Sequence, residues 1–282
     1  MTADASAKDI QARLELALSA GREAAAITLK YFRQDNFEVE LKADKSPVTV
    51  ADRESETHLR KRITEAFPHD AILGEEFPAV EGTSGFRWIL DPIDGTKSFV
   101  HGVPFYGTMI GVDFSGSSNP IASPDKPSEP RVVVGVVFLP GLDEVVYASR
   151  GQGTWQIRGQ GAPKRCQVSK CANLEDALFL TTSVQAFEKL GRREAYDGIA
   201  RAARLTRTWG DCYGYLMVAT GRAEVMVDPI MNLWDAAAVQ PIVEEAGGTF
   251  TDWRGKHTVL TGEGVATNGH VLDAVVAHTR GK

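Results

Sequence analysis

One segment, residues 88–99, constrains the fold more than any other part of the chain, because it predicts where a strand must end. It reads Trp-Ile-Leu-Asp-Pro-Ile-Asp-Gly-Thr-Lys-Ser-Phe, and its apolar run stops at Asp91. Pro92 fixes φ and cannot donate to a β-ladder, whereas Gly95 tolerates positive φ, so we expect a strand that ends at Asp91 and a tight turn after it. The turn places two carboxylates, those of Asp91 and Asp94, at the carboxyl end of a strand.

The residues after this turn, Gly95-Thr96-Lys97-Ser98, can begin a helix whose first N–H groups have no intrahelical partner. Such N–H groups bind anions, and carboxylates bind hard cations. Carboxylates for cations beside amides for a phosphate are the components of metal-assisted phosphoryl transfer. The segment therefore predicts that chemistry.

The composition is that of a globular protein: 282 residues, 43% of them hydrophobic and 24% charged, enough for one large or two closely packed domains. The formal charge of −6 argues against nucleic-acid binding, which normally needs a basic face. The three cysteines show no zinc-ligand spacing, so we expect reduced thiols. The N-terminus lacks the features of a signal peptide, and the longest apolar run, Val132–Leu139, is too short to span a membrane. We therefore expect a cytoplasmic protein with no membrane partner.

Two patterns divide the chain into halves, an α+β half over residues 1–170 that carries most metal ligands and an α/β half over residues 171–282 that completes the site. The first half has strands that follow one another without helices, which is typical of an antiparallel meander, and the second alternates strands with helices. The expected helices cover residues 7–32, 49–67, 187–205, 211–221 and 234–246, the last kinked at Pro241. The expected strands cover residues 37–42, 71–76, 88–91, 106–112, 131–139, 144–148, 178–182, 205–209, 223–227 and 249–251.

Four more acidic residues have positions of interest, and each also has an ordinary explanation. Asp52 lies in the first turn of the second expected helix, where the helix dipole favours an acid. Glu75 and Glu76 follow a short strand, and ligands of open α/β sheets collect at such strand ends, although paired acids are common in solvated loops. Asp235 begins a helix, where it can serve as N-cap. Together with the two carboxylates of the first turn, these oxygen ligands predict a site for a hard cation such as magnesium.

Three segments resemble the signature segments of the inositol monophosphatase family, whose members are lithium-sensitive, magnesium-dependent phosphomonoesterases. They are Glu75-Glu76, residues 91–96 (Asp-Pro-Ile-Asp-Gly-Thr) and residues 234–237 (Trp-Asp-Ala-Ala). The resemblance extends from the helix of Asp52 to Gly248. Within the family, residues 207–215 (Arg-Thr-Trp-Gly-Asp-Cys-Tyr-Gly-Tyr) and Asp228-Pro229 look most like the histidinol-phosphate phosphatase branch of bacteria and plants.

The resemblance implies an α/β fold of mixed α+β character, a layered αβαβα sandwich of the inositol monophosphatase/fructose-bisphosphatase type, in a homodimer. It also implies two to three Mg²⁺ ions per active site. Glu75, Asp91 and the backbone carbonyl of Ile93 would hold the first ion. Asp91, Asp94 and Asp235 would hold the second, and Glu75 with water a weaker third.

The same resemblance implies the roles of the remaining site residues. Asp52, Glu75 and Thr96 would be catalytic, with Asp52 and Thr96 orienting and deprotonating the attacking water. The amides of Gly95 and Thr96, with the Thr96 hydroxyl, would bind the phosphate. The alcohol part of the substrate would face Asp94, Asp211, Cys212 (through its amide), Asp228 and Asp235.

The metal ions are expected to supply most of the rate. Phosphate-monoester hydrolysis is among the slowest uncatalysed reactions, and enzymes accelerate it by up to ~10²¹-fold. Acid catalysis by a single residue contributes roughly 10²–10⁴-fold, which is far too little. Metal ions account for the difference, because they neutralise the phosphate oxygens and hold the attacking water and the leaving oxygen in line.

The identity of the alcohol depends on two further acids. The branch resemblance implies hydrolysis of L-histidinol phosphate to L-histidinol and phosphate, a step of histidine and hence amino-acid biosynthesis. We hypothesise that Asp211 and Asp228 favour the cationic amine of that substrate, although Asp211 can also be explained as a helix cap. The alternatives are an inositol-1-monophosphatase or another small-monoester phosphatase of this family and, in a different class, a metal-binding regulatory protein without turnover.

Overall fold

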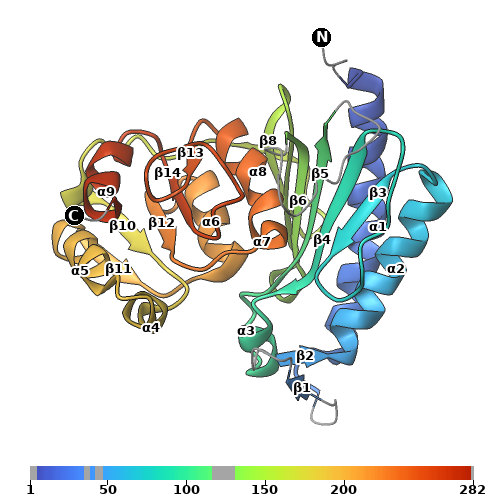
Figure 1. Cartoon of the computed structure of the whole chain (residues 1–282), viewed down its shortest axis with the longest axis horizontal. Helices are drawn as coiled ribbons and strands as arrows, with labels where there is room; N and C mark the ends of the chain where they lie inside the picture. The colour runs from blue at the N-terminus through green and yellow to red at the C-terminus, as the bar shows by residue number, and fades with distance from the viewer. Residues whose placement is uncertain (1–4, 35–38, 42–46, 116–130, 281–282) are drawn as a thin grey trace.

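In the described part of the chain, the larger of two main sheets has seven strands in the order β3-β4-β5-β6-β7-β8-β9 (Figure 1). The computed structural model describes residues 5–34, 39–41, 47–115 and 131–280. Only β3 runs parallel to β4; the other neighbours are antiparallel, which confirms the predicted meander. The strands of this sheet are β3 (Ala71–Gly74), β4 (Phe86–Asp94), β5 (Gly107–Phe114), β6 (Val132–Leu139), β7 (Glu144–Ser149), β8 (Gly153–Arg158) and β9 (Lys164–Cys166).

Strand β4 is longer than predicted, because it continues past Asp91 to Asp94. Asp91 pairs with Met109 and Asp94 pairs with Gly107, so two residues of β4 face one residue of β5 in a β-bulge. Pro92 donates no hydrogen bond, but its carbonyl accepts one from the Thr108 hydroxyl at 2.9 Å. The Thr108 side chain of β5 thus replaces one hydrogen bond of the ladder. The bulge places the carboxylates of Asp91 and Asp94 near the end of β4.

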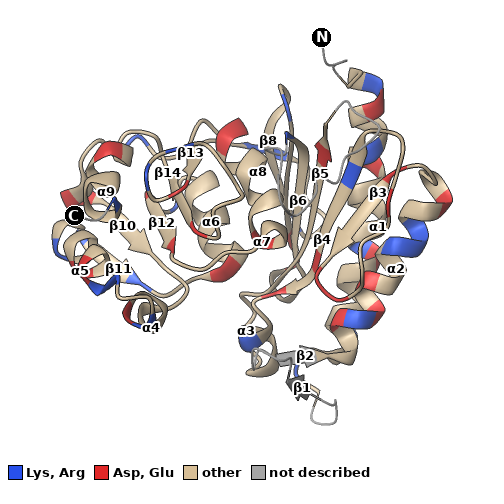
Figure 2. Cartoon of the chain, viewed as in Figure 1, with Lys and Arg blue, Asp and Glu red and all other residues tan. Residues whose placement is uncertain are grey.

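Helices α1 (Ala7–Tyr31) and α2 (Val50–Ala66) cover one face of this sheet, as predicted, and α2 shows Lys and Arg interspersed with Asp and Glu (Figures 1 and 2). A short antiparallel pair, β1 (Val39–Leu41) and β2 (Pro47–Thr49), precedes α2. Apolar side chains of both helices pack on the sheet in one core that includes Leu14, Leu59 and Trp88.

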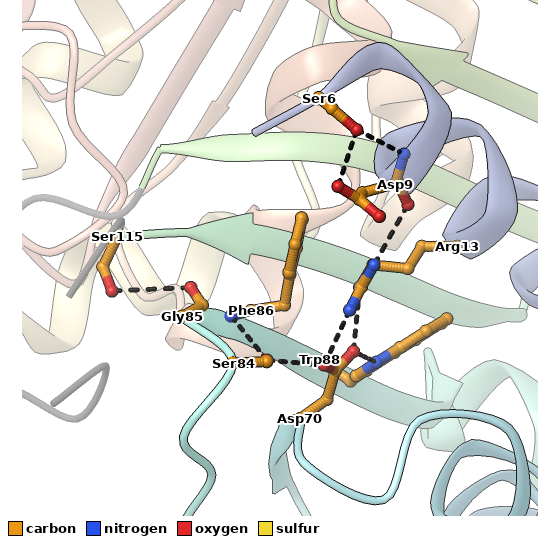
Figure 3. Close-up of polar contacts among 9 residues, drawn as sticks. All are labelled: Ser6, Asp9, Arg13, Asp70, Ser84, Gly85, Phe86, Trp88 and Ser115. Atoms are coloured by element: carbon orange, nitrogen blue, oxygen red, sulfur yellow. Dashed lines mark hydrogen bonds and ion pairs between the residues drawn. The ribbon is translucent and has the colours of Figure 1, made fainter. Parts of the chain in front are cut away.

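A buried ion pair fixes α1 to the beginning of the sheet (Figure 3). Arg13 donates to both carboxylate oxygens of Asp70, at 2.8 and 2.7 Å, and its guanidinium lies over the Phe86 ring. Asp70 also accepts hydrogen bonds from Trp88 Nε1 at 2.9 Å and from Ser84 Oγ at 2.6 Å. With four donors the buried carboxylate is fully satisfied, so the start of β4 has a rigid support.

The smaller sheet has five strands in the order β11-β10-β12-β14-β13. The pairs β10–β11 and β10–β12 are parallel, and the pairs that involve β14 are antiparallel. Its strands are β10 (Leu178–Leu180), β11 (Leu205–Arg207), β12 (Val225–Asp228), β13 (Thr249–Thr251) and β14 (Gly264–Thr267). Helices on its outer face are α4 (Val184–Lys189), α5 (Arg193–Ala202) and α9 (Leu272–Thr279), and they pack on a core that includes Phe179, Phe187 and Trp253.

Three helices lie between the two sheets: α6 (Asp211–Ala219), α7 (Leu233–Ala237) and α8 (Val239–Glu245) (Figure 1). They share one core with both sheets, which includes Val137, Leu216 and Phe250. The predicted kink at Pro241 is a break at Ala238, since proline has no N–H for the carbonyl of Ala237.

The five layers are therefore helices, sheet, helices, sheet and helices, and the predicted αβαβα sandwich is confirmed. The sequence missed β2, β9, β14 and α9, gave no bounds for β8, and merged α4 and α5 into a single helix. The proposed division at residue 170 lies between β9 and β10 and stays a prediction.

Two further predictions concern segments at the limits of the described structure. Of the expected strand over residues 37–42, Val39–Leu41 form β1 and the rest lies outside the described residues. Residues 115–130, between the expected strands 106–112 and 131–139, are rich in Ser and Pro and predict an exposed connection, of which residues 116–130 also lie outside the described part. In the described part of the chain, none of the helices combines the length and apolar character needed to cross a bilayer.

Candidate metal centre and active site

Three carboxylates from distant parts of the chain meet at the end of β4. Asp91 and Asp94 come from the bulge, and Asp235 comes from α7 on the neighbouring layer. One oxygen of each lies within 4.8 Å of the others. The cluster joins the first half of the sequence to the second, and its oxygen-only donor set is the kind that hard divalent cations prefer.

Burial and like charge raise the pKa of each of these acids. Burial comes first for Asp91 and is followed by the charges of Glu75, Asp94 and Asp235, so the pKa of Asp91 lies well above its usual range. The pKa of Asp94 is also raised well above its usual range by burial and then by Asp211. Burial raises the pKa of Asp235 to about 6. A cation at this position would reverse these shifts, because it would favour the ionised forms.

Backbone amides hold the three carboxylates in place. The N–H of Ile93 donates to Asp91 Oδ1 at 3.1 Å, and the N–H of Cys212 donates to Asp94 Oδ2. The interpretation of Asp235 as an N-cap is wrong, because Asn232 occupies the cap and Asp235 is the third helical residue of a capping box. Asp235 accepts the N–H of Asn232 at 2.7 Å, which orients its carboxylate.

Glu75 lies next to this cluster because β3 and β4 are parallel. Gly74 pairs with Leu90, and the N–H of Glu75 donates to the carbonyl of Leu90 at 3.2 Å, so both strands end at the same edge. The charge of Glu75 is among the causes that raise the pKa of Asp91 and of Asp235. Glu75 is not one of the three residues within 4.8 Å of one another.

Asp52 uses its two carboxylate oxygens differently. Oδ2 accepts hydrogen bonds from the N–H of Thr49 at 2.8 Å and from its hydroxyl at 2.6 Å, which completes a capping box at the start of α2. Oδ1 is buried and has no hydrogen-bond partner among the described residues. Burial, with the charges of Glu76 and Glu75, raises the pKa of Asp52 to about 7 against the opposing hydrogen bonds of Thr49. Asp52 thus lies in the first turn of the helix, as predicted, where one of its oxygens completes the capping box and the other has no described partner.

The predicted phosphate seat lies directly after the bulge. Gly95 has φ of +79° and caps α3 (Thr96–Val100), and the Thr96 hydroxyl donates to the carbonyl of Ile93 at 3.0 Å. A Cβ at residue 95 would lie 3.0 Å from Asp211 Oδ2, so both the positive φ and the close approach require glycine. The carbonyl predicted to bind metal and the hydroxyl predicted to bind phosphate therefore contact each other here.

Asp228 is held by a different set of partners at the end of β12. Its Oδ1 accepts the N–H of Thr182 at 2.8 Å and the hydroxyl of Thr181 at 3.2 Å. Its Oδ2 accepts the hydroxyls of Thr182 at 2.9 Å and of Tyr215 at 3.2 Å. Burial raises the pKa of Asp228, and these hydrogen bonds oppose the shift.

Asp211 does not cap α6, which corrects the ordinary explanation of this residue. Gly210 is the N-cap, and Asp211 is the first helical residue with φ of +50°, a conformation that L-residues rarely adopt. Its N–H donates to Thr182 Oγ1 at 2.8 Å, and Oδ2 lies 3.4 Å from the Ser98 hydroxyl. Burial and then the charge of Asp228 raise the pKa of Asp211 to about 7.

Thr182 is the residue of this site that the sequence did not single out. Its hydroxyl accepts from Asp211 and donates to Asp228, so it fixes both acids. It directly follows Thr181 at the carboxyl end of β10, beside β12. The strand-end rule that identified Asp91 and Glu75 applies here too, and it could have found this residue.

A cleft of about 700 Å³ joins the predicted phosphate seat to three of the acids. Its lining includes Gly95 and Thr96 together with Asp211, Asp228 and Asp235. The lining also has apolar, aromatic and basic side chains, namely Val103, Phe105, Trp209, Lys97 and Lys189. The cleft has the size of a site for a small molecule.

The five-layer sandwich is the one that the resemblance to the inositol monophosphatase family implies, and the three acids of the cluster are residues that it implies as metal ligands. The chain belongs to the inositol monophosphatase family, since the sequence profile of that family matches residues 9–282. This confirms the family predicted from the three segments.

Individual relatives agree with that assignment. The chain is 41% identical to a histidinol-phosphatase of Chlorobaculum parvum, over 94% of this chain and 93% of the relative, and 36% identical to a histidinol-phosphatase of Streptomyces coelicolor, over 94% and 96%. An IMPase structure from Thermotoga maritima has a TM-score of 0.78 and 30% identity, over 95% of this chain and 96% of that one. The predicted likeness to the histidinol-phosphatase branch is confirmed by the first two.

Proposed function

We propose that this protein is a magnesium-dependent phosphomonoesterase that hydrolyses L-histidinol phosphate to L-histidinol and phosphate. The meeting of the Asp91, Asp94 and Asp235 carboxylates within 4.8 Å, directly beside the Gly95–Thr96 turn, carries the proposal. The similarity to two histidinol-phosphatases supports this choice of ester.

The chain's own residues fit the ions that the family implies. Glu75, Asp91 and the Ile93 carbonyl would hold one Mg²⁺, Asp91, Asp94 and Asp235 a second, and Glu75 with water a third. The donor set is all oxygen, and its raised pKa values are those of carboxylates that lack a counter-charge. When bound, such ions neutralise the charge of the phosphate and lower the pKa of a bound water molecule.

The protein groups would then bind and orient the reactants. The amides of Gly95 and Thr96 and the Thr96 hydroxyl would bind the phosphate oxygens. Asp52 would accept a proton from the attacking water through Oδ1, whose lack of a partner leaves it available, with Thr96 helping to orient that water. The pKa of Asp52, about 7, is close to the pH at which a general base works best.

The alcohol part of the substrate would lie against Asp94, the Cys212 amide, Asp211, Asp228 and Asp235. Asp211 and Asp228 line the cleft next to the phosphate seat, so they offer negative charge to the amine of histidinol phosphate. An inositol phosphate has no cation to match them. The pair therefore favours an aminoalkyl ester over a polyol ester.

A panel of phosphate esters tests the proposal directly. Phosphate release from L-histidinol phosphate, inositol 1-phosphate, a nucleoside 3′-phosphate and fructose 1,6-bisphosphate would be measured with Mg²⁺ and with a chelator. We expect the highest kcat/KM for histidinol phosphate and no release with the chelator. A higher value for inositol phosphate would assign the IMPase activity instead, and no release from any ester would favour a regulatory metal-binding protein.

We also propose that the protein works in the cytoplasm as a homodimer, as the resemblance implies. Light scattering coupled to gel filtration would measure its mass against the 30.6 kDa of one chain. A mass of one chain at micromolar concentration would refute the dimer without affecting the proposed reaction.

A further inference from the structure

The loop after β3, which carries Glu75, is tied to α2 by two residues that the reaction does not use, Glu56 and Arg60. Glu56 is fully buried, and its Oε2 accepts the N–H of Glu76 at 2.8 Å. Its other oxygen, Oε1, accepts Arg60 Nε at 2.7 Å. The buried Glu56 carboxylate of α2 therefore accepts hydrogen bonds from one amide of the loop and from one arginine.

Arg60 completes the connection with its two remaining nitrogens. Nη2 donates to the carbonyl of Phe77 at 2.9 Å, and Nη1 donates to the carbonyl of Pro78 at 3.0 Å. The rigid fork of a guanidinium thus holds two successive carbonyls while it pairs with Glu56. Together the two side chains hold three consecutive residues, 76–78, which begin immediately after Glu75.

The strand before Glu75 is shaped to admit this carboxylate. A Cβ at Gly74 would lie 2.0 Å from Glu56 Oε1, a distance that no side chain allows. Gly74 pairs with Leu90, the neighbour of Asp91. Glu56 therefore packs against the backbone of β3 at the end that lies next to the metal cluster. Glu56 thus contacts residues on both sides of Glu75: it packs against Gly74 and accepts a hydrogen bond from Glu76.

A structural purpose alone does not explain such an arrangement. Burial raises the pKa of Glu56, and an apolar side chain in its place would avoid that cost. A hydrophobic contact, however, would not set the direction of the loop backbone. Hydrogen bonds to successive amide and carbonyl groups do set it, and metal ligands depend on such support.

We infer that Glu56 and Arg60 are positioning residues, which fix the backbone of residues 76–78 and thereby aim the Glu75 carboxylate at the ion shared with Asp91. The inference rests on the proposed function, in which Glu75 is a metal ligand. It predicts that loss of the connection weakens metal binding itself, and that it affects the substrate only through the metal.

Isothermal titration of Mg²⁺ into Arg60→Met, Glu56→Gln and a matched control tests this. Lys61→Ala is the control, because Lys61 is the next cation on α2, is exposed, and makes only an exposed pair with Glu65 at 3.9 Å. For Arg60→Met and Glu56→Gln we expect the Kd for Mg²⁺ to rise roughly 10–100-fold, as for other residues that support metal ligands. Kinetics should show kcat restored by excess Mg²⁺ with little change in substrate KM, and Lys61→Ala should match the wild type.

Each other result has a distinct meaning. Wild-type protein that binds no Mg²⁺ would refute the proposed function, whereas wild-type binding with equal Kd in both variants would refute the positioning role. A lower melting temperature with unchanged Kd would also refute it, since that is the signature of a structural role alone. If neither variant folds, hydrogen exchange of the wild type decides: we expect the Glu76 amide to be protected without metal, and rapid exchange would overturn the inference.

Discussion

The dipeptide Asp-Pro occurs near the end of a strand in both main sheets, as Asp91-Pro92 in the bulge of β4 and as Asp228-Pro229 where β12 ends, and the two aspartates have opposite surroundings. Asp91 receives a backbone N–H from Ile93 and is otherwise surrounded by carboxylates. Asp228 receives four hydrogen bonds, from Thr181, Thr182 and Tyr215.

The same dipeptide can therefore serve two purposes. A carboxylate that is surrounded by like charges is stabilised by a bound cation. A carboxylate that accepts hydrogen bonds from neutral donors is already stabilised, and those bonds fix its orientation. We therefore assign metal binding to the strand end of the larger sheet and substrate recognition to that of the smaller sheet. Substitutions at the two strand ends, and the pH dependence of stability, test this division.

Removing a charge from the metal cluster should have the largest effect. In Asp91→Asn and Asp94→Asn we expect turnover to fall by roughly 10³-fold or more, because the loss of metal-based stabilisation amounts to several kcal/mol. The metal-free fold should persist, since each change relieves repulsion among buried acids. Phosphate release and a thermal melt measure the two quantities, and near-normal turnover in either variant would sink the metal assignment.

The equivalent substitution at the strand end of the smaller sheet should change the substrate KM and leave metal binding unchanged. For Asp228→Asn we expect the KM for histidinol phosphate to rise about 10-fold, the loss of roughly one charge-assisted contact, with the Kd for Mg²⁺ unchanged. Titration calorimetry and initial rates separate the two. A large rise in the Kd for Mg²⁺ would mean that the two strand ends are not functionally distinct.

Asp211→Asn should change selectivity more than rate. We expect the preference for histidinol phosphate over inositol phosphate to fall by about 5- to 10-fold, because the amide keeps the shape and removes the charge. The ratio of the two kcat/KM values measures this. A variant that retained the wild-type preference would show that Asp211 does not recognise the amine.

The smallest effect concerns the stability of the metal-free protein. The pKa values of Asp52 and Asp211, about 7, and of Asp235, about 6, lie above the value of about 4 in an unfolded chain. The folded state therefore binds more protons, and the stability that these groups contribute is full below pH 4 and is lost as the pH rises through 6–7. Melting temperatures between pH 5 and pH 8 should fall, by about 2–4 °C for each kcal/mol lost.

Saturating Mg²⁺ supplies the control for this pH dependence. Ion binding requires ionised ligands, so the stabilisation by metal should grow over the same range. A metal-free melting temperature that rises steadily from pH 5 to pH 8 would contradict the raised pKa values.

Local sequence signals predicted most of the layers. The long apolar stripe of α1, the apolar strands of the meander and the alternation of strands and helices after residue 170 are short-range patterns that packing preserves. The missed strands β2, β9 and β14 have only three or four residues each, which is too short for a clear periodic pattern. The end of β4 was misjudged because a side chain of another strand, Thr108, compensates for the missing proline donor.

The site divides in the same way. Asp91 and Asp94 lie at the end of β4, and Glu75 and Thr182 follow β3 and β10, so the strand-end rule can find all four residues. It cannot find their partners: Thr182 bonds Asp228, 46 residues away. Glu56 likewise supports Glu76 across 20 residues. Partners at such separations are set by the tertiary fold and leave no local pattern in the sequence.

The division between the two strand ends can be tested in one crystal. Manganese can replace magnesium at oxygen ligands and gives an anomalous signal, so diffraction from crystals grown with Mn²⁺ would locate each ion. We predict anomalous peaks coordinated by Asp91, Asp94 and Asp235, and none coordinated by Asp228. An ion on Asp228, or a well-ordered cluster of these three acids without one at saturating Mn²⁺, would contradict the account.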